Sequence, residues 1–210
     1  MHSRLQYVSQ GESGHVQLDN IRQALDAGCQ WIQLRFKQAS ADDLIALAEQ
    51  VKMYCEKYRA CFIINDHPDI AREVDADGVH LGLNDMPIDH ARTIVGEKKI
   101  IGGTANTLQD VFQRVNEKCD YVGVGPYRFT TTKDKLSPIL GLIGYQNIMT
   151  SLEVHDIQTP IYAIGGIAID DIDALLGCGV YGVAVSGMIT QHENKVALLQ
   201  ILNQKLYATT

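Results

Sequence analysis

Short apolar runs alternate with longer amphipathic stretches along the whole chain. A short apolar run bounded by turn residues predicts a buried strand, and apolar residues that recur every three or four positions predict a helix. The short runs predict eight strands, which cover Leu5–Ser9, Trp31–Phe36, Cys61–Asn65, Gly78–Gly82, Lys99–Gly103, Tyr121–Gly125, Ile161–Gly165 and Gly182–Ser186.

The stretch Ala41–Tyr58 shows the helical pattern most clearly. Ser40 stands at its N-cap position and acidic residues follow in the first turn, where a hydroxyl and negative charge both stabilise a helix. Its apolar residues form one stripe, made by Leu44, Leu47, Ala48, Val51 and Cys55. Further helices are predicted at Pro87–Val95, which Pro87 opens and Gly96 ends, and at Leu108–Glu117, Tyr145–Leu152, Asp170–Leu176 and a last stretch ending near Leu206.

Strands that alternate with helices predict a parallel sheet with right-handed crossovers. Eight such units favour a closed (β/α)8 barrel, the TIM barrel, over an open doubly wound sheet. Residues 1–210 are expected to form a single domain, because no linker or low-complexity segment divides them. A barrel of this length is close to the lower limit of roughly 200 residues, so its loops must be short. The longest loop, after the sixth strand, is expected to be functional.

Composition and charge exclude several functions. The net charge of −7 disfavours nucleic acid and anionic membranes as partners. No apolar run is long enough to span a bilayer, and polar residues rather than a signal peptide follow Met1. The five scattered cysteines include no CxxC pair, so neither a disulfide framework nor a zinc site is indicated. We therefore expect a cytoplasmic protein whose partners are small molecules, either as a monomer or as a homo-oligomer.

Basic side chains end the second predicted strand. In a parallel barrel the C-terminal strand ends open on one face, and chemistry takes place there. Gln33, Arg35 and Lys37 alternate in phase, so all three are expected on the same side of the strand. Two cations directed into the barrel would be costly without an anion, which indicates an anionic ligand. The alternative is a different register, in which both cations lie outside the barrel.

Carboxylates with a neighbouring amide follow the next two strands, as Asn65-Asp66 and Asn84-Asp85. These residue types are also common as helix N-caps and turn formers, and that alternative stays open. If both carboxylates only capped helices, however, the basic residues at the strand ends would have no explanation. Mg²⁺ takes one or two carboxylates together with phosphate oxygens and water. Carboxylates, a metal ion and basic groups together predict a diphosphate site.

The sixth strand leads into three hydroxyls and a lysine, Thr130 to Lys133. Such a loop suits a phosphate, although a solvated turn has the same composition. Gly165-Gly166 and Ser186 follow the last two strands, where barrels commonly bind a monophosphate, and predict a second phosphate site. No residue has the surroundings of an activated nucleophile, and His80 is interpreted as a core histidine.

Seven motifs in this order resemble the thiamine phosphate synthase family: QLRFK (33–37), IIND (63–66), ADGVHLGLND (76–85), GGTANT (102–107), GPYRFTTTK (125–133), AIGGI (163–167) and AVSGMI (184–189). The resemblance implies a TIM-barrel transferase of thiamine biosynthesis. Such an enzyme condenses 4-amino-5-hydroxymethyl-2-methylpyrimidine diphosphate with 4-methyl-5-(2-phosphoethyl)thiazole, or its carboxylated form, to thiamine phosphate and pyrophosphate. The resemblance also implies a mechanism in which Mg²⁺ assists dissociative loss of pyrophosphate before the thiazole nitrogen attacks.

The resemblance assigns roles to individual residues. The pyrimidine diphosphate would be bound by Gln33, Leu34, Arg35, Phe36, Lys37, Asn65, Thr104 and Lys133. The metal ligands would be Asp66 and Asp85. The thiazole phosphate would be bound by Thr130, Thr131, Thr132, Gly166, Val185 and Ser186. Catalysis would rest on Arg35, Lys37 and Lys133, which would stabilise the leaving diphosphate.

The chain departs from the family's motifs at a few positions. Phe36 replaces an acidic residue, and we expect it to point away from the barrel interior. Thr104 stands where serine is common, and its hydroxyl can serve the same ligand. Asn106 replaces a histidine, which puts the contacts to the pyrimidine in doubt. Arg128 and Phe129 alter the start of the threonine loop, residues 125–133.

Two other functions stay open at this point. A thiazole tautomerase on the same barrel would need the monophosphate site and a general base, but neither metal nor diphosphate, so Asp66, Asp85 and Lys133 argue against it. A non-catalytic barrel that binds phosphate ligands would be stabilised against heat by those ligands without turning them over.

Overall fold

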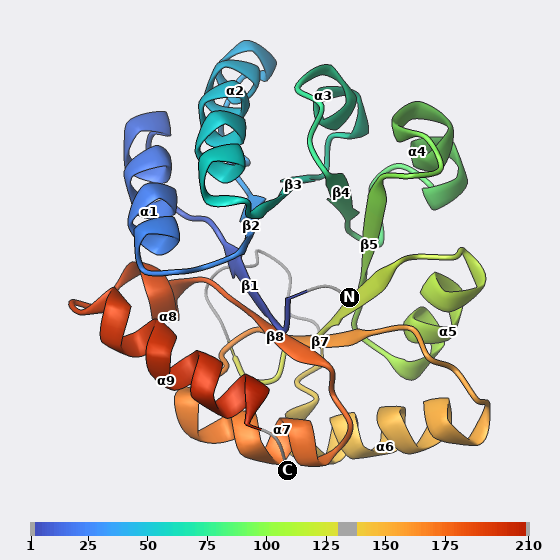
Figure 1. Cartoon of the computed structure of the whole chain (residues 1–210). Helices are drawn as coiled ribbons and strands as arrows, with labels where there is room; N and C mark the ends of the chain where they lie inside the picture. Colours follow the sequence, from blue (N-terminus) through green and yellow to red (C-terminus); the bar gives the residue numbers. More distant parts are fainter. Residues whose placement is uncertain (1–2, 130–137, 209–210) are drawn as a thin grey trace.

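In the computed structural model, which describes residues 3–129 and 138–208, eight parallel strands close into a barrel. Neighbouring strands follow one another in chain order, and β1 pairs with β8 to complete the ring. Figure 1 shows the strands at the centre and the helices around them. The predicted TIM barrel is therefore confirmed. The strands are β1 (Leu5–Val8), β2 (Trp31–Leu34), β3 (Cys61–Asn65), β4 (Gly78–Leu81), β5 (Ile100–Ala105), β6 (Tyr121–Val124), β7 (Ile161–Ile164) and β8 (Gly182–Val185).

The helices cover the outside of the barrel. In the longest of those described, the Ser40 hydroxyl accepts a hydrogen bond from the Asp43 N–H and so caps the helix as predicted. The helices are α1 (Gly14–Asp26), α2 (Ala41–Tyr58), α3 (Pro68–Glu73), α4 (Ile88–Val95), α5 (Leu108–Asn116), α6 (Gly141–Val154), the 3-10 turn η1 (Ile169–Asp171), α7 (Ile172–Gly177), α8 (Gly187–Thr190) and α9 (Lys195–Tyr207).

Some helices differ from the prediction. The pattern does not predict α1, α3 or α8. Pro87 is the N-cap of α4 rather than its first helical residue, and α6 begins at Gly141, four residues before the predicted start at Tyr145. The helix expected over Asp170–Leu176 starts as the 3-10 turn η1 and becomes α-helical at Ile172.

The strand β5 extends two residues beyond its predicted end at Gly103. Gly102 and Gly103 therefore lie in the middle of the strand and not at its end. A Cβ atom on Gly102 would come within 2.1 Å of Cζ of Tyr121, and one on Gly103 within 2.6 Å of Cδ of Arg114. The two glycines make room for these large side chains on either face of the strand. As a result Thr104 lies within β5 rather than after it.

The barrel interior is apolar where the strands begin and polar where they end. Trp31, Ile63, Tyr121 and Tyr162 form the apolar cluster, and the Trp31 ring meets the Tyr121 and Tyr162 rings edge to face at centroid distances of 4.9 and 5.1 Å. The larger hydrophobic core lies between the strands and the helices. Polar side chains in the interior are thus concentrated at the end of the barrel where the loops carry the predicted site.

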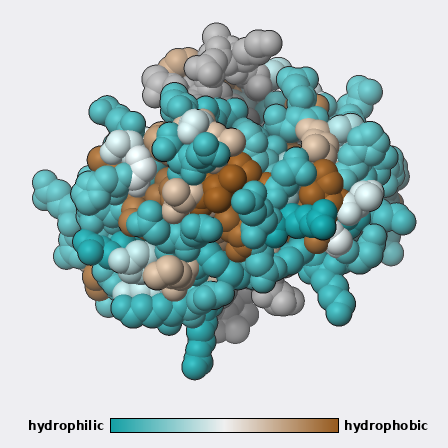
Figure 2. Space-filling view, turned by 90° about the horizontal axis from the view of Figure 1, so that it is seen from above, coloured by the Kyte–Doolittle hydropathy of each residue, from teal (hydrophilic) through white to brown (hydrophobic). Residues whose placement is uncertain are grey.

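The outer surface is largely hydrophilic on the face shown in Figure 2, where hydrophobic residues appear in separate smaller areas. Among the described residues, no helix combines the length and the apolar character needed to cross a membrane.

Candidate active site

Polar side chains of neighbouring strands pair at the C-terminal end of the barrel. Between β2 and β3, Gln33 Nε2 donates a hydrogen bond of 2.7 Å to Asn65 Oδ1. Between β4 and β5, His80 Nε2 lies 3.0 Å from Thr104 Oγ1. All four residues are buried. Because buried polar groups that satisfy one another hold their side chains in place, these pairs present a fixed polar surface to the space above the barrel.

The acidic residues Asp66 and Asp85 lie in contact beside Lys37. Lys37 Nζ is 3.4 Å from Asp66 Oδ2, and Asp85 Oδ2 accepts a 2.6 Å hydrogen bond from the Gly82 N–H. Asp66 has a φ of +67°, in the left-handed region that aspartate tolerates better than most residues. Burial, together with the neighbouring Asp85 carboxyl, raises the pKa of Asp66, and Lys37 offsets part of that rise.

Two touching carboxylates with one nearby lysine fit a divalent cation. Without a cation, their mutual repulsion and the burial of Asp66 both oppose ionisation. The described residues contain no group of three or more His, Cys, Asp or Glu side chains suited to a metal. A metal held by Asp66 and Asp85 would therefore need ligands from phosphate oxygens and water, as Mg²⁺ commonly does.

The backbone of Arg35 is held in place by two side chains from neighbouring segments. The Arg35 N–H donates to Ser9 Oγ over 3.0 Å, and its carbonyl accepts from Gln17 Nε2 over 3.2 Å. Leu34 is buried in the outer hydrophobic core and Phe36 packs against it, so both side chains turn away from the barrel interior. A ligand above the barrel would meet the backbone of these two residues, not their side chains.

A chain of hydrogen bonds connects Thr104 to the middle of the barrel. Gln6 Nε2 donates to Tyr121 Oη over 3.1 Å, and Tyr121 Oη lies 3.0 Å from His80 Nδ1. In the His80 tautomer with its proton on Nε2, the phenol donates to Nδ1 and Nε2 donates to Thr104 Oγ1, which is consistent with the bond from Gln6 to the phenol oxygen. Burial raises the pKa of Tyr121, which keeps this phenol protonated. The network directs the Thr104 hydroxyl to donate toward the site, and His80 is the bonded core histidine that the sequence indicated.

Sequence reasoning missed Arg114, which joins two strand ends from outside the barrel. Its side chain is 3% exposed. Nε donates to the Thr104 carbonyl over 3.1 Å, Nη2 to the Gly82 carbonyl over 2.8 Å, and Nη1 to Glu117 Oε2 over 2.6 Å. The one available signal was its position on α5, three residues after the buried Val111, which puts an arginine on the buried face.

The predicted ligands Thr130, Thr131, Thr132 and Lys133 lie outside the described residues, so their roles stay predictions. The start of the threonine loop is fixed by two side chains that depart from the family motifs, Asn106 and Arg128. Asn106 Nδ2 donates to the Gly125 carbonyl, which links the ends of β5 and β6.

The side chain of Arg128 joins the same loop to the segment after β7. Its guanidinium forms a two-pronged ion pair with Asp171, in which Nη2 lies 2.6 Å from Oδ1, and Nη1 donates to the Gly166 carbonyl over 3.1 Å. The hydrogen bonds from Arg128 lower the pKa of Asp171. The pair joins residues that are 43 positions apart. Because the two residues are so far apart in the sequence, no local sequence pattern predicts this ion pair.

The remaining predicted residues lie after β7 and at the end of β8. Ser186 Oγ donates to Gln10 Oε1 over 3.2 Å. Val185 is buried in the outer core, so a ligand would meet its backbone. No helix follows Gly166 directly, because η1 begins only at Ile169. The backbone of these segments, rather than a long helix, would have to bind an anion here.

The chain resembles proteins of one family over nearly its whole length. Residues 6–189 match the family described as thiamine monophosphate synthase. The thiamine-phosphate synthase of Flavobacterium johnsoniae is 55% identical over 208 residues, which cover 99% of this chain and 98% of that protein. The corresponding protein of Bacteroides thetaiotaomicron is 46% identical over 202 residues, covering 96% and 97%. The thiamine phosphate pyrophosphorylase structure from Pyrococcus furiosus superposes with a TM-score of 0.84 at 29% identity, covering 98% of this chain and 96% of that one.

Proposed function

The chain belongs to the thiamine monophosphate synthase family, and we propose that it joins 4-amino-5-hydroxymethyl-2-methylpyrimidine diphosphate to 4-methyl-5-(2-phosphoethyl)thiazole, or to its carboxylated form. The products are thiamine phosphate and pyrophosphate. The observation that carries the proposal is the contact between Asp66, Asp85 and Lys37 beside the buried pair Gln33–Asn65. Carboxylates for a metal, a cation and neutral hydrogen-bonding groups suit a diphosphate attached to an uncharged ring.

The leaving diphosphate is stabilised by positive charge. Asp66 and Asp85 hold Mg²⁺, which when bound supplies positive charge to the diphosphate oxygens. Arg35, Lys37 and Lys133 bind the same oxygens and stabilise the charge that develops as the C–O bond breaks. The electron pair of that bond leaves with the diphosphate, so the protein supplies electrostatic stabilisation rather than a nucleophile.

The pyrimidine ring is oriented by neutral groups. Gln33, Asn65 and Thr104 offer amide and hydroxyl groups that neither carry charge nor attack the ring. When His80 carries its proton on Nε2, it donates to Thr104 Oγ1. The Thr104 hydroxyl proton is then available to donate to the pyrimidine ring. This arrangement positions the exocyclic carbon toward the centre of the site, where the second substrate approaches.

The thiazole phosphate is bound on the other side of the barrel mouth. Thr130, Thr131 and Thr132 donate hydroxyl hydrogen bonds to its phosphate, and Ser186 does so when its hydroxyl turns away from Gln10. Gly166 and Val185 contribute backbone. The thiazole nitrogen uses its lone pair to form the new C–N bond with the pyrimidine carbon once the diphosphate has left. Holding both substrates in this orientation supplies much of the rate enhancement.

Substitution of Asp66 tests the proposal. Asp66→Asn and Lys133→Ala are expected to lower the rate of pyrophosphate release by at least about a hundredfold, because the first removes a proposed metal ligand and the second a cation that stabilises the leaving diphosphate. Asp69→Asn is the matched control, since Asp69 is an exposed carboxylate three residues away. Circular dichroism spectra check that all variants fold. Mg²⁺-dependent turnover that survives in both site variants would refute these roles.

A further inference from the structure

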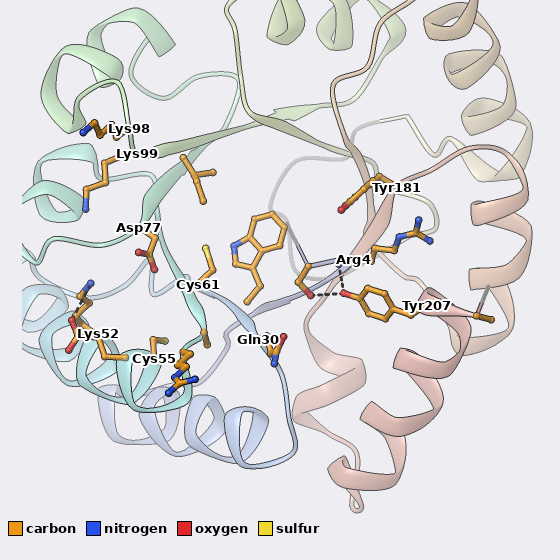
Figure 3. A pocket seen from close by; sticks show the side chains of 17 residues that line it. Arg4, Gln30, Lys52, Cys55, Cys61, Asp77, Lys98, Lys99, Tyr181 and Tyr207 are labelled. Carbon is orange, nitrogen blue, oxygen red and sulfur yellow. Dashed lines mark hydrogen bonds and ion pairs between the residues drawn. The ribbon is translucent and has the colours of Figure 1, made fainter. Parts of the chain in front are cut away.

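An open cavity of about 1270 Å³ lies at the end of the barrel where the strands begin, opposite the candidate active site (Figure 3). Its lining includes Trp31, Cys61 and Ile100, which are the first residues of β2, β3 and β5. The ends of α2 and α9 complete the wall. Among the described residues, none of the candidate active-site residues lines this cavity, so it is a separate feature of the fold.

The cavity is lined by more positive than negative charge. Five basic side chains line it, against the two carboxylates of Glu56 and Asp77. The whole chain carries a net charge of −7, so this excess of positive charge is local. Figure 3 shows basic side chains on two sides of the opening. They are Lys52, Lys98 and Lys99 on the side of Asp77, and Arg4 beside Tyr181 and Tyr207 on the other.

Three of the five cations already interact with other groups. Lys52 Nζ lies 3.4 Å from Glu56 Oε1, and Lys99 pairs with Asp75. Arg4 Nη1 donates to the Leu206 carbonyl over 2.9 Å, in the last turn of α9. Lys52 and Lys99 are thus paired with carboxylates, and Arg4 stabilises a helix-terminal carbonyl, so these three need no ligand to account for them.

The other two cations, Arg59 and Lys98, are not accounted for in this way. Within the described residues, neither side chain has an ion pair or a hydrogen bond. Arg59 lies just after α2 and Lys98 just before β5, and both line the same cavity. Both side chains are exposed and line one cavity from different segments, so an anion in the cavity can contact both.

The floor of the cavity strengthens the attraction for an anion. Trp31 and Ile100 are apolar, and burial raises the pKa of Cys61 to about 12, so its thiol stays neutral. A charged ligand above an apolar floor has fewer water molecules to screen it, and its attraction to the surrounding cations is stronger than in bulk water.

We propose that this cavity binds a polyphosphate anion. The basic groups come from three separate parts of the chain around an opening larger than one phosphate, so several phosphates in a row can contact them at once. Arg59 and Lys98 bind the anion directly, and Arg4, whose partner is a neutral carbonyl, adds positive potential. The ligand's charge, and not an enzymatic reaction at this end of the barrel, determines binding.

The single tryptophan of the chain provides a reporter for this cavity, because Trp31 lies in its lining. Inorganic tripolyphosphate is titrated into the protein while tryptophan fluorescence is recorded. A saturable change is expected in the wild type. Arg59→Gln combined with Lys98→Gln is expected to weaken binding by about tenfold or more, because two charge-assisted contacts are lost. Lys57→Gln is the matched control, since it removes a charge from α2 outside the cavity.

Two further variants separate this cavity from the active site. Lys37→Gln alters the opposite end of the barrel and should leave the fluorescence response unchanged, whereas the Arg59/Lys98 double variant should keep the wild-type turnover rate. The proposal is overturned by any of three results: no saturable response at millimolar tripolyphosphate, the same affinity in the double variant as in the wild type, or a response that is lost equally in Lys57→Gln or Lys37→Gln.

Discussion

Replacing Arg114 by methionine tests how the strand ends of the site are held in place. The guanidinium donates to the carbonyls of Gly82 and Thr104 and pairs with Glu117. Methionine fills a similar volume without offering a donor. Arg114→Met therefore leaves two carbonyls next to the site without their partner, while Glu117, which is partly exposed, can turn to water.

The size of the effect follows from the bonds that are lost. A hydrogen bond from a charged donor contributes about 1.5–3 kcal/mol, so two carbonyls lose about 3–6 kcal/mol. The folded protein no longer has to desolvate a guanidinium, which returns about 1–3 kcal/mol. We expect a net loss of about 2–4 kcal/mol. For a chain of this length this corresponds to a fall in melting temperature of about 4–16 °C.

Thermal unfolding and turnover measure the two consequences. The melting temperature of ligand-free Arg114→Met should fall as calculated, and kcat should fall because Thr104 and the turn that holds Asp85 are less well fixed. Arg114→Lys, which keeps the charge but cannot reach both carbonyls at once, should lie in between. Arg72→Met, an exposed arginine on α3, is the control. A melting temperature and kcat of Arg114→Met equal to those of the control would refute the reasoning.

Three further predictions concern single side chains. Burial and the neighbouring Asp85 raise the pKa of Asp66, so ionised Asp66 destabilises the metal-free fold at neutral pH, and this contribution is lost as pH falls toward the unfolded pKa of roughly 3.9. In pH-dependent melting curves the stability difference between the wild type and Asp66→Asn should therefore shift in favour of the wild type as pH falls, and a difference that does not change with pH would contradict this. Tyr121→Phe removes the hydrogen bonds that the phenol makes with Gln6 Nε2 and His80 Nδ1, and should cost about 1–3 kcal/mol in thermal unfolding; full stability would contradict the network. Arg128→Ala should raise the KM for the thiazole phosphate more than that for the pyrimidine diphosphate in steady-state kinetics, and equal effects on both would contradict its role.

Much of the fold follows from local patterns. The apolar runs place all eight predicted strands, because a buried parallel strand is apolar on both faces. The helix α1 was missed for a physical reason. Its buried face includes Gln17, which is 2% exposed and bonds to the carbonyls of Gly11 and Arg35, so the apolar stripe is interrupted. The helices α3 and α8 are six and four residues long, which is too short to show a helical period.

The candidate site could be predicted only in part. Gln33 was predicted because it stands in phase with Arg35 and Lys37, and Asn65 because an amide and a carboxylate follow the third strand. In the register of β2 and β3 Gln33 stands opposite Ile63, so its bond to Asn65 runs diagonally to a residue two positions farther along β3. Contacts between distant segments left no such signal. Gln6 and Tyr121 are 115 residues apart and meet only because the barrel closes. Arg114 left only the weak signal of its spacing from Val111, and its burial and hydrogen bonds show that it holds two strand ends.

The most direct test of the central claim is formation of thiamine phosphate by the purified protein. The pyrimidine diphosphate and the thiazole phosphate are supplied together or singly, with Mg²⁺ or with a chelator, and both thiamine phosphate and pyrophosphate are quantified. We predict that the two products form in equal amounts, and only when both substrates and Mg²⁺ are present. Folded protein that forms no thiamine phosphate under these conditions, or that forms it equally well with the chelator, would contradict the account.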